Sequence, residues 1–146
     1  MKSSDFKKAA KFFMFDTLIT GIIVNKSLHG LGIETAIHER LDEIKQKHFR
    51  IDMSHQDQLF FQEFVAMVEK NKDDTVYVLD FTTGCDKELK DHLFQLIFNR
   101  QHNGFKIHHN TRTILIFRHD ESKEYILPKS DDYWVIHSPF YHITEA

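Results

Sequence analysis

Residues 75–101 have the sequence TVYVLDFTTGCDKELKDHLFQLIFNRQ, and this stretch decides the fold that we expect. It begins with an apolar run, 76–79, that ends on the carboxylate of Asp80. A turn of small residues follows, and then come apolar residues at helical spacing: Leu89, Leu93, Leu96 and Ile97. A buried strand that ends on an acid, with a helix behind it, is typical of open α/β sheets.

The rest of the chain repeats this alternation of strand and helix. Runs of β-branched and apolar residues predict further strands at 17–24, 49–53 and 113–117, and shorter ones at 105–107, 125–128 and 133–136. Helical spacing predicts helices at 5–15, from residue 33 to about 45, and at 54–70, where SHQD supplies the N-cap signal. We therefore predict one α/β domain over 1–146, with a mostly parallel sheet covered by helices on both faces.

Composition limits the classes of protein that fit the chain. The 146 residues are 41% hydrophobic and 28% charged, which is typical of a globular domain with a buried core. The net charge of -3 gives no electrostatic reason to expect a nucleic-acid partner. A single cysteine, Cys85, excludes an internal disulfide framework and fits a reducing cytoplasm. The apolar run at 12–24 contains Asp16 and is too short to span a bilayer, so we expect no membrane anchor.

Several short motifs occur in an order that resembles a known family. They are ITGIIVNKS at 19–27, HFRIDMSHQD at 48–57, LFQLIFNRQ at 93–101, NGFKI at 103–107, TRTILIF at 111–117 and YILP at 125–128. This order resembles the MoxR-like branch of the AAA+ ATPases. The resemblance implies a P-loop NTPase-like fold, with the phosphate-binding loop near 19–27 and an acid at Asp80 for the magnesium ion.

The chain departs from that family at the positions that carry its chemistry. A phosphate-binding loop needs glycines, because successive backbone N–H groups must wrap the phosphates. Between Gly21 and the pair Lys26-Ser27 the chain has Ile, Ile, Val and Asn, and the motif is one residue short. Phe81 stands where the family has a glutamate that activates water, and Phe cannot act as a base. We also expect no helical lid before Ala146, and the resemblance therefore predicts a degenerate core without ATPase activity.

Two enzymatic alternatives remain open. Lys26, Ser27 and Asp80 are the candidate residues of a residual nucleotide site, and a divergent ATPase would use them with ATP and Mg²⁺. The competing interpretation is that Lys26 and Ser27 form a solvated loop end and that Asp80 caps a turn.

The eleven histidines raise a second alternative, a small metal-dependent nuclease. The densest group comprises His108, His109, His119, His137 and His142. Their spacing fits no standard zinc pattern, so we expect no metal site and interpret them as surface histidines. Cys85 lies at an expected helix N-terminus, where the dipole can lower a thiol pKa, but no base is assigned to it.

Phenylalanines are more numerous than one helix face can bury, with fourteen in the chain. Clusters at the first and third predicted helices suggest either fully buried helices or a protein contact surface, formed by Phe12, Phe13, Phe15, Phe60 and Phe61. The leading hypothesis is a non-catalytic AAA+-like module, without a cofactor, that binds a protein partner. That partner is an AAA+ ATPase, which the module modulates or inhibits, or a second copy of the chain. We expect an accessory protein of a phage or mobile element.

Overall fold

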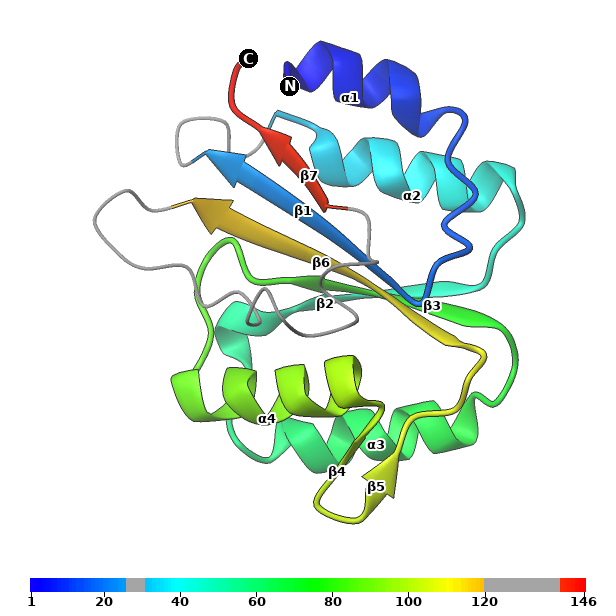
Figure 1. Ribbon diagram of the computed structural model, residues 1–146, viewed down its shortest axis with the longest axis vertical. Coiled ribbons are helices and arrows are strands. Elements are labelled where there is room, and N and C mark those ends of the chain that lie inside the picture. The colour runs from blue at the N-terminus through cyan, green and yellow to red at the C-terminus, as the bar shows by residue number, and fades with distance from the viewer. Residues whose placement is uncertain (26–30, 120–139) are drawn as a thin grey trace.

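Five parallel strands form the centre of the computed structural model, which describes residues 1–25, 31–119 and 140–146 (Figure 1). The strands are β1 (Ile19–Asn25), β2 (His48–Asp52), β3 (Thr75–Asp80), β6 (Thr111–His119) and β7 (Phe140–Ile143). They lie in the order β2-β3-β6-β1-β7, and every neighbouring pair is parallel. The predicted parallel sheet is confirmed. Its last strand, β7, was not predicted.

Two helices cover each face of the sheet (Figure 1). They are α1 (Ser3–Ala10) and α2 (Ile33–Glu43) on one face, and α3 (Phe60–Lys70) and α4 (Lys87–Asn99) on the other. Because side chains of a strand point alternately to its two faces, β3 contributes to both cores. Val76 and Val78 pack toward α1 and α2, whereas Tyr77 and Leu79 pack toward α3 and α4. The predicted three-layer arrangement is confirmed.

The helix expected within residues 75–101 forms as its periodicity predicts. The side chain of Asp86 caps the start of α4, because its Oδ1 atom accepts a hydrogen bond of 2.9 Å from the Leu89 N–H. All four apolar residues of the predicted stripe are buried: Leu89, Leu93, Leu96 and Ile97. Burial of each such side chain contributes about 1.5–3 kcal/mol to folding.

The first helix ends earlier than predicted because arginines hold the backbone that follows it outside a helix. The helix predicted at 5–15 ends at Ala10. Beyond it the Nε atom of Arg40 donates to the Phe13 carbonyl at 2.7 Å, and Arg112 donates to the Phe15 carbonyl. Phe15 itself has a φ of 49°, a value outside the right-handed helical region.

The helix predicted to begin at Ser54 begins at Phe60 instead. Residues Met53–His55 form a short 3-10 helix, η2, and Ser54 donates from its N–H and its hydroxyl to Asp52 Oδ1, at 2.9 and 2.7 Å. Asp57 then precedes α3, and its Oδ1 atom accepts from the Leu59 N–H at 2.9 Å. The SHQD motif was therefore a turn signal, and Leu59, which lies before the first residue of α3, is 66% exposed.

A hairpin follows α4 where only one short strand, at 105–107, was predicted. Its strands are β4 (Gln101–His102) and β5 (Phe105–Lys106). Asn103 and Gly104 have φ values of 50° and 83°, and positive φ at both central residues is the requirement of a two-residue type I′ hairpin. The strands predicted at 125–128 and 133–136 lie outside the described residues. None of the described helices is long and apolar enough to cross a membrane.

Candidate functional site

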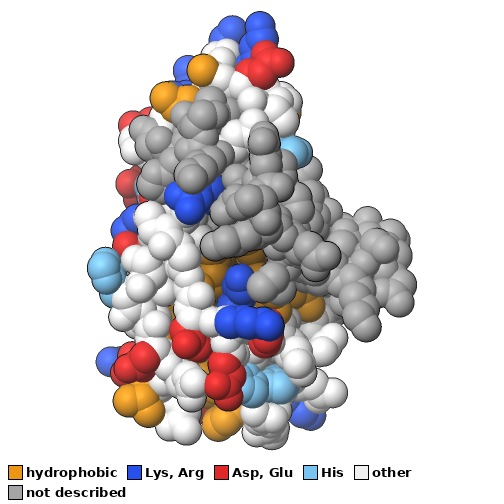
Figure 2. All heavy atoms as spheres, turned by 90° about the vertical axis from the view of Figure 1, so that its left-hand side faces the viewer, with side chains coloured by type: hydrophobic (Ala, Val, Ile, Leu, Met, Phe, Trp, Pro, Cys, Tyr) orange, Lys and Arg blue, Asp and Glu red, His pale blue; other side chains and the backbone are white. Residues whose placement is uncertain are grey.

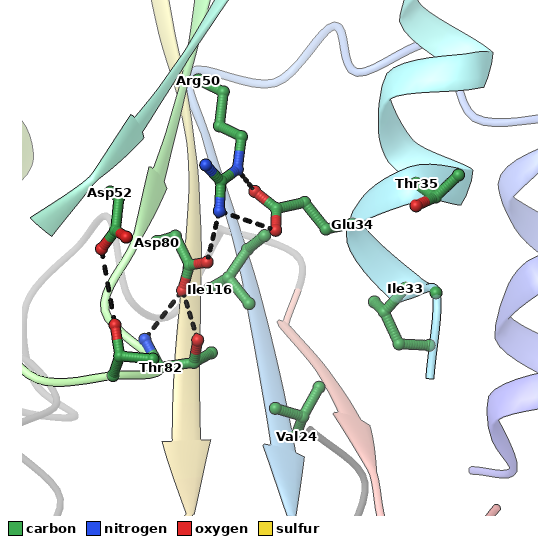
Figure 3. A pocket seen from close by; sticks show the side chains of 11 residues that line it. Val24, Ile33, Glu34, Thr35, Arg50, Asp52, Asp80, Thr82 and Ile116 are labelled. Atoms are coloured by element: carbon green, nitrogen blue, oxygen red, sulfur yellow. Dashed lines mark hydrogen bonds and ion pairs between the residues drawn. The ribbon is translucent and has the colours of Figure 1, made fainter. Parts of the chain in front are cut away.

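A cavity of about 220 Å³ opens at the edge of the sheet where the strands end and α2 begins. Open α/β sheets bind their ligands in the crevice outside the carboxyl ends of the strands, so this is the candidate site. Its charged lining comes from α2, β2 and β3 and consists of three carboxylates and one guanidinium: Glu34, Asp52, Asp80 and Arg50 (Figure 3). In the face drawn in Figure 2, acidic and basic side chains lie close together around a hollow with hydrophobic side chains at its base.

Asp80 occupies the last position of β3, as predicted, and is only 6% exposed. Its Oδ1 atom accepts hydrogen bonds from the backbone N–H and the hydroxyl of Thr82, at 2.8 and 2.5 Å. Its Oδ2 atom lies 3.3 Å from Nη2 of Arg50. Both oxygens of Asp80 are therefore engaged by groups of the chain itself.

Arg50 connects Asp80 to the first turn of α2 (Figure 3). Its Nε atom donates to Glu34 Oε1, and its Nη2 atom donates to Glu34 Oε2 at 3.2 Å. Burial by itself would raise the pKa of Glu34, but hydrogen bonds from His38 and Arg50 outweigh burial and lower this pKa to about 2. The hydrogen bond with Glu34 raises the pKa of Arg50 in turn. The three side chains thus form an ion-paired bridge between α2, β2 and β3.

Asp52 adds the third carboxylate beside this bridge. It pairs with Asp80 in the register of β2 and β3, so the two acids end neighbouring strands side by side. Asp52 Oδ1 accepts from the hydroxyl and N–H of Ser54, and these bonds lower the pKa of Asp52. The hydroxyl of Thr83 donates to the same oxygen at 3.4 Å. The described polar side chains of the cavity therefore carry two more negative charges than positive ones.

The first residues of α2 differ from those of a phosphate-binding loop. In that loop the Lys and Ser/Thr of the motif open the helix that follows the strand. Here Gly32, with a φ of 79°, precedes the helix, and Ile33 and Glu34 occupy its first turn. Lys26 and Ser27, the predicted pair, lie outside the described residues, and α2 begins only at Ile33.

Phe81 points away from the cavity. It is 7% exposed and packs on the α4 side of the sheet, where its ring stacks on Phe117 at 5.5 Å and meets Phe94 edge-on at 5.5 Å. Successive residues of an extended chain point to opposite faces, which separates Phe81 from Asp80. Phe81 is therefore a core residue.

The five phenylalanines that were predicted as an interaction surface do not lie on one surface. Phe15, Phe60 and Phe61 are core residues with exposures of 6%, 4% and 8%, so their assignment to a surface was wrong. Phe60 and Phe61 are buried because α3 packs against both the sheet and α4, whereas Phe15 belongs to the core on the α1 and α2 side of the sheet. Phe13 is partly buried and stacks on Tyr141 at 5.0 Å. Phe12 alone of the five is widely exposed, at 80%.

The other candidate groups gain no chemical role from the geometry. Among residues 1–25, 31–119 and 140–146, no three His, Cys, Asp or Glu side chains are placed to hold a metal ion. The rings of His108 and His109 contact each other at 4.2 Å, whereas His137 lies outside the described residues. Burial raises the pKa of Cys85 to about 11, opposite to the lowering expected from the helix dipole, so its thiol is protonated at neutral pH.

Arg50, Glu34 and Asp52 were missed as site residues. Glu34 is 16 residues from Arg50, and Asp80 is 30 residues from it, so no local pattern connects the three. One signal was available, because FRID at 49–52 and VYVLD at 76–80 both end on an acid. In parallel strands these ends meet at one edge of the sheet, and Arg50 shares a face with Asp52.

Two solved structures share this fold. Rif2 of Saccharomyces cerevisiae matches with 11% identity and a TM-score of 0.58, over 97% of this chain and 54% of that one. The P216G variant of RuvB from Thermotoga maritima matches with 14% identity and a TM-score of 0.53, over 96% of this chain and 43% of that one. The chain thus spans about half the length of each. No family model matches the chain, and no curated protein matches its sequence.

At these identities the likeness shows the fold alone. RuvB is an AAA+ P-loop ATPase, and the match extends over nearly the whole of this chain. The α/β domain described here is therefore consistent with a P-loop NTPase-like fold, as the sequence motifs implied.

Proposed function

We propose that this chain is a non-catalytic AAA+-like module that acts by binding another protein, either an AAA+ ATPase or a second copy of itself. One observation carries the proposal. Arg50 joins Glu34 to Asp80 across the cavity in which this class of fold holds its ligand. The acid on which a nucleotide-bound Mg²⁺ would depend already has an internal cation and two donors from Thr82.

The charge of the cavity supports the same proposal. A nucleotide triphosphate would bring further negative charge beside Glu34, Asp52 and Asp80, with only Arg50 as a described counter-charge. Two like charges 4 Å apart repel by about 4 kcal/mol at the effective dielectric of a protein surface. A Mg²⁺ ion at Asp80 would have to compete with Arg50 for that carboxylate. The described residues therefore fit a magnesium nucleotide poorly.

Hydrolysis also needs a group that activates water, and the residue after Asp80 supplies none. Phe81 is apolar and packs among Phe94 and Phe117, so it cannot accept a proton. This placement supports an inactive core rather than a divergent ATPase.

A protein-binding role gains support from the segment between α1 and β1. Phe12 and Met14 are 80% and 56% exposed, although the intervening Phe13 is anchored through its carbonyl to Arg40. The carbonyl of Phe15 is anchored to Arg112. Large apolar side chains that are exposed on a fixed backbone are typical of contact surfaces, because little conformational entropy is lost when they bind.

A thermal-shift titration with ATP and Mg²⁺ tests the first half of the proposal. A ligand that binds only the folded chain raises its melting temperature, by an amount set by its concentration relative to Kd. We expect no rise at millimolar ATP and no release of phosphate. A rise that Lys26→Ala removes, together with ATP turnover, would show a working nucleotide site and contradict the proposal.

A pull-down with the purified chain tests the second half. We expect an AAA+ ATPase, or an untagged copy of this chain, to be retained, and the double substitution Phe12→Ser with Met14→Ser to reduce retention at least tenfold. Leu59→Ser is the matched control, because Leu59 is also apolar and 66% exposed but lies at the start of α3. Equal loss in both variants would contradict a contact surface at Phe12.

A further inference from the structure

Two histidine rings face each other between α4 and the hairpin β4–β5. Nδ1 of His92 lies 2.8 Å from Nε2 of His102, which is hydrogen-bonding distance. A ring nitrogen that carries a proton donates, and one without a proton accepts. The contact therefore requires that at least one of the two facing nitrogens has no proton.

The pair lies over an aromatic side chain of α3. The ring of Phe61 is 5.9 Å from His92, 5.8 Å from His102 and 5.9 Å from Phe105, which belongs to the other strand of the hairpin. Phe61 is only 8% exposed as a result. The histidine pair and the hairpin together cover one end of the core between α3 and α4.

Few charged groups face the pair from the elements packed against it. On α4, Glu88 Oε1 lies 3.9 Å from His92 Nε2, and its other oxygen accepts from Gln58 at 2.7 Å. On the hairpin, Lys106 pairs with Gln101 rather than with His102. Glu88 can compensate one proton on His92, but no described ion pair compensates a second proton on His102.

We propose that His92 and His102 form a clasp that opens in acid, so that the hairpin β4–β5 separates from α3 and α4 and uncovers Phe61. With one proton shared between the facing nitrogens, the hydrogen bond persists. With a proton on each, both nitrogens are donors, and two like charges face each other at 2.8 Å. This device does not depend on the proposed function, because neither histidine lines the cavity or belongs to the segment between α1 and β1.

The direction of the pH dependence follows from the surroundings of His102. Burial and the neighbouring His92 lower the pKa of His102 from its ordinary value of 6.5. A histidine with a depressed pKa in the folded chain stabilises the closed form fully above pH 6.5. That stabilisation is lost as the pH falls below this value. The clasp is thus closed at neutral pH and opens in acid.

Hydrogen exchange followed by NMR tests the clasp in the intact chain. The Ile107 N–H, which donates to the Arg100 carbonyl at 2.9 Å, reports on the hairpin, and the Val78 N–H reports on the sheet. We expect the protection factor of Ile107 to fall at least tenfold between pH 7.5 and pH 5.0, and that of Val78 to change less than twofold. Protection factors are compared because intrinsic exchange itself depends on pH.

Two variants separate the clasp from a general effect of acid. His102→Gln keeps a polar side chain that does not titrate, so the fall at Ile107 is expected to disappear. His55→Gln removes an 83% exposed histidine on η2, and the fall is expected to remain. If His102→Gln does not fold, a ¹⁵N titration of the His102 imidazole in the unaltered chain decides, because its pKa is expected below the ordinary 6.5 and its protonation should coincide with the fall at Ile107.

Three outcomes would overturn the proposal. Equal losses of protection at Ile107 and Val78 would mean that acid unfolds the whole domain. A fall at Ile107 that persists in His102→Gln would assign the effect to another group. Opening of the hairpin by a chelator alone at pH 7.5 would mean that a metal ion, and not a hydrogen bond, joins the two rings.

Discussion

Two arginines lie at opposite ends of the strands of the sheet, and each joins several segments of the chain. Arg112, at the amino end of β6, is 9% exposed. Its guanidinium donates to the Phe15 carbonyl, to Gln46 Oε1 at 2.5 Å and to Asp74 Oδ1 at 2.7 Å. Arg50, near the carboxyl end of β2, has a side chain that is 45% exposed and contacts two carboxylates.

The difference lies in what each arginine joins. Arg112 binds one acid and two neutral acceptors from the segments that precede β1, β2 and β3, so it fixes three loops where no ligand is expected. Arg50 joins two acids at the edge where α/β sheets bind ligands. The first arrangement is structural, whereas the second alters the charge of a cavity. The two should therefore respond differently to substitution.

The largest effect is expected from Arg112→Met. The substitution leaves the Phe15 carbonyl without its buried donor, and loss of one partner of a buried polar network costs about 3 kcal/mol of unfolding free energy. Urea denaturation at pH 7 measures this loss. Lys47→Met is the control, because the ion pair of Lys47 with the 82% exposed Asp73 is worth at most about 0.5 kcal/mol. A loss of unfolding free energy below about 1 kcal/mol for Arg112→Met would contradict a structural role for Arg112 that Arg50 does not share.

A smaller effect is expected from Arg50→Met, because solvent screens a half-exposed cation. The expected loss at pH 7 is about 1.5 kcal/mol. The pKa of Glu34, about 2 in the folded chain against 4.5 ordinarily, means that the bridge stabilises fully above pH 4.5 and weakens as the pH falls toward 2. The variant should therefore lose less stability than the unaltered chain between pH 5 and pH 3 in urea titrations. Parallel pH curves for the two proteins would show that Arg50 does not hold Glu34 ionised.

The two ends of the sheet, around Arg112 and around Arg50, show how far the sequence predicts the structure. The strands and helices followed from periodicity, because the alternation of Val76 to Leu79 and the stripe from Leu89 to Ile97 are local signals with one physical solution. The boundaries failed where distant side chains decide the backbone. No local signal shows that Arg40 and Arg112 end the first helix at Ala10 by holding carbonyls further along.

The site was predictable only in part. Asp80 was identified because a strand that ends on an acid is a local pattern. The role of Asp80 in the cavity depends on Arg50, which comes from a neighbouring strand, and on Glu34, which comes from a helix across the cavity. Such contacts depend on strand order, and the order β2-β3-β6-β1-β7 follows from the packing of the whole chain rather than from any segment. The prediction of a phenylalanine surface failed for the same reason, because Phe61 is covered by a hairpin that was not predicted.

The smallest effect is expected from the removal of one hydrogen-bond donor to Asp80. Thr82→Val removes the hydroxyl that donates to Asp80 Oδ1 but keeps the backbone donor, so we expect a loss of about 0.7 kcal/mol in urea denaturation at pH 7. Thr82 and Arg50 serve the two oxygens of one carboxylate that is 6% exposed. In the double variant with Arg50→Met that carboxylate keeps only one of these three donors.

The loss in the double variant should therefore exceed the sum of the single losses by about 0.5–1 kcal/mol, because a buried charge tolerates the removal of one donor better than the removal of two. Thr83→Val, combined with Arg50→Met, is the matched control, since the hydroxyl of Thr83 donates to Asp52 instead. In this control the losses of unfolding free energy of the two single substitutions should add. Additivity in both cycles would mean that Arg50 and Thr82 do not stabilise the carboxylate of Asp80 together, and the cavity would then lack the internal cation on which its assignment as an inactive site depends.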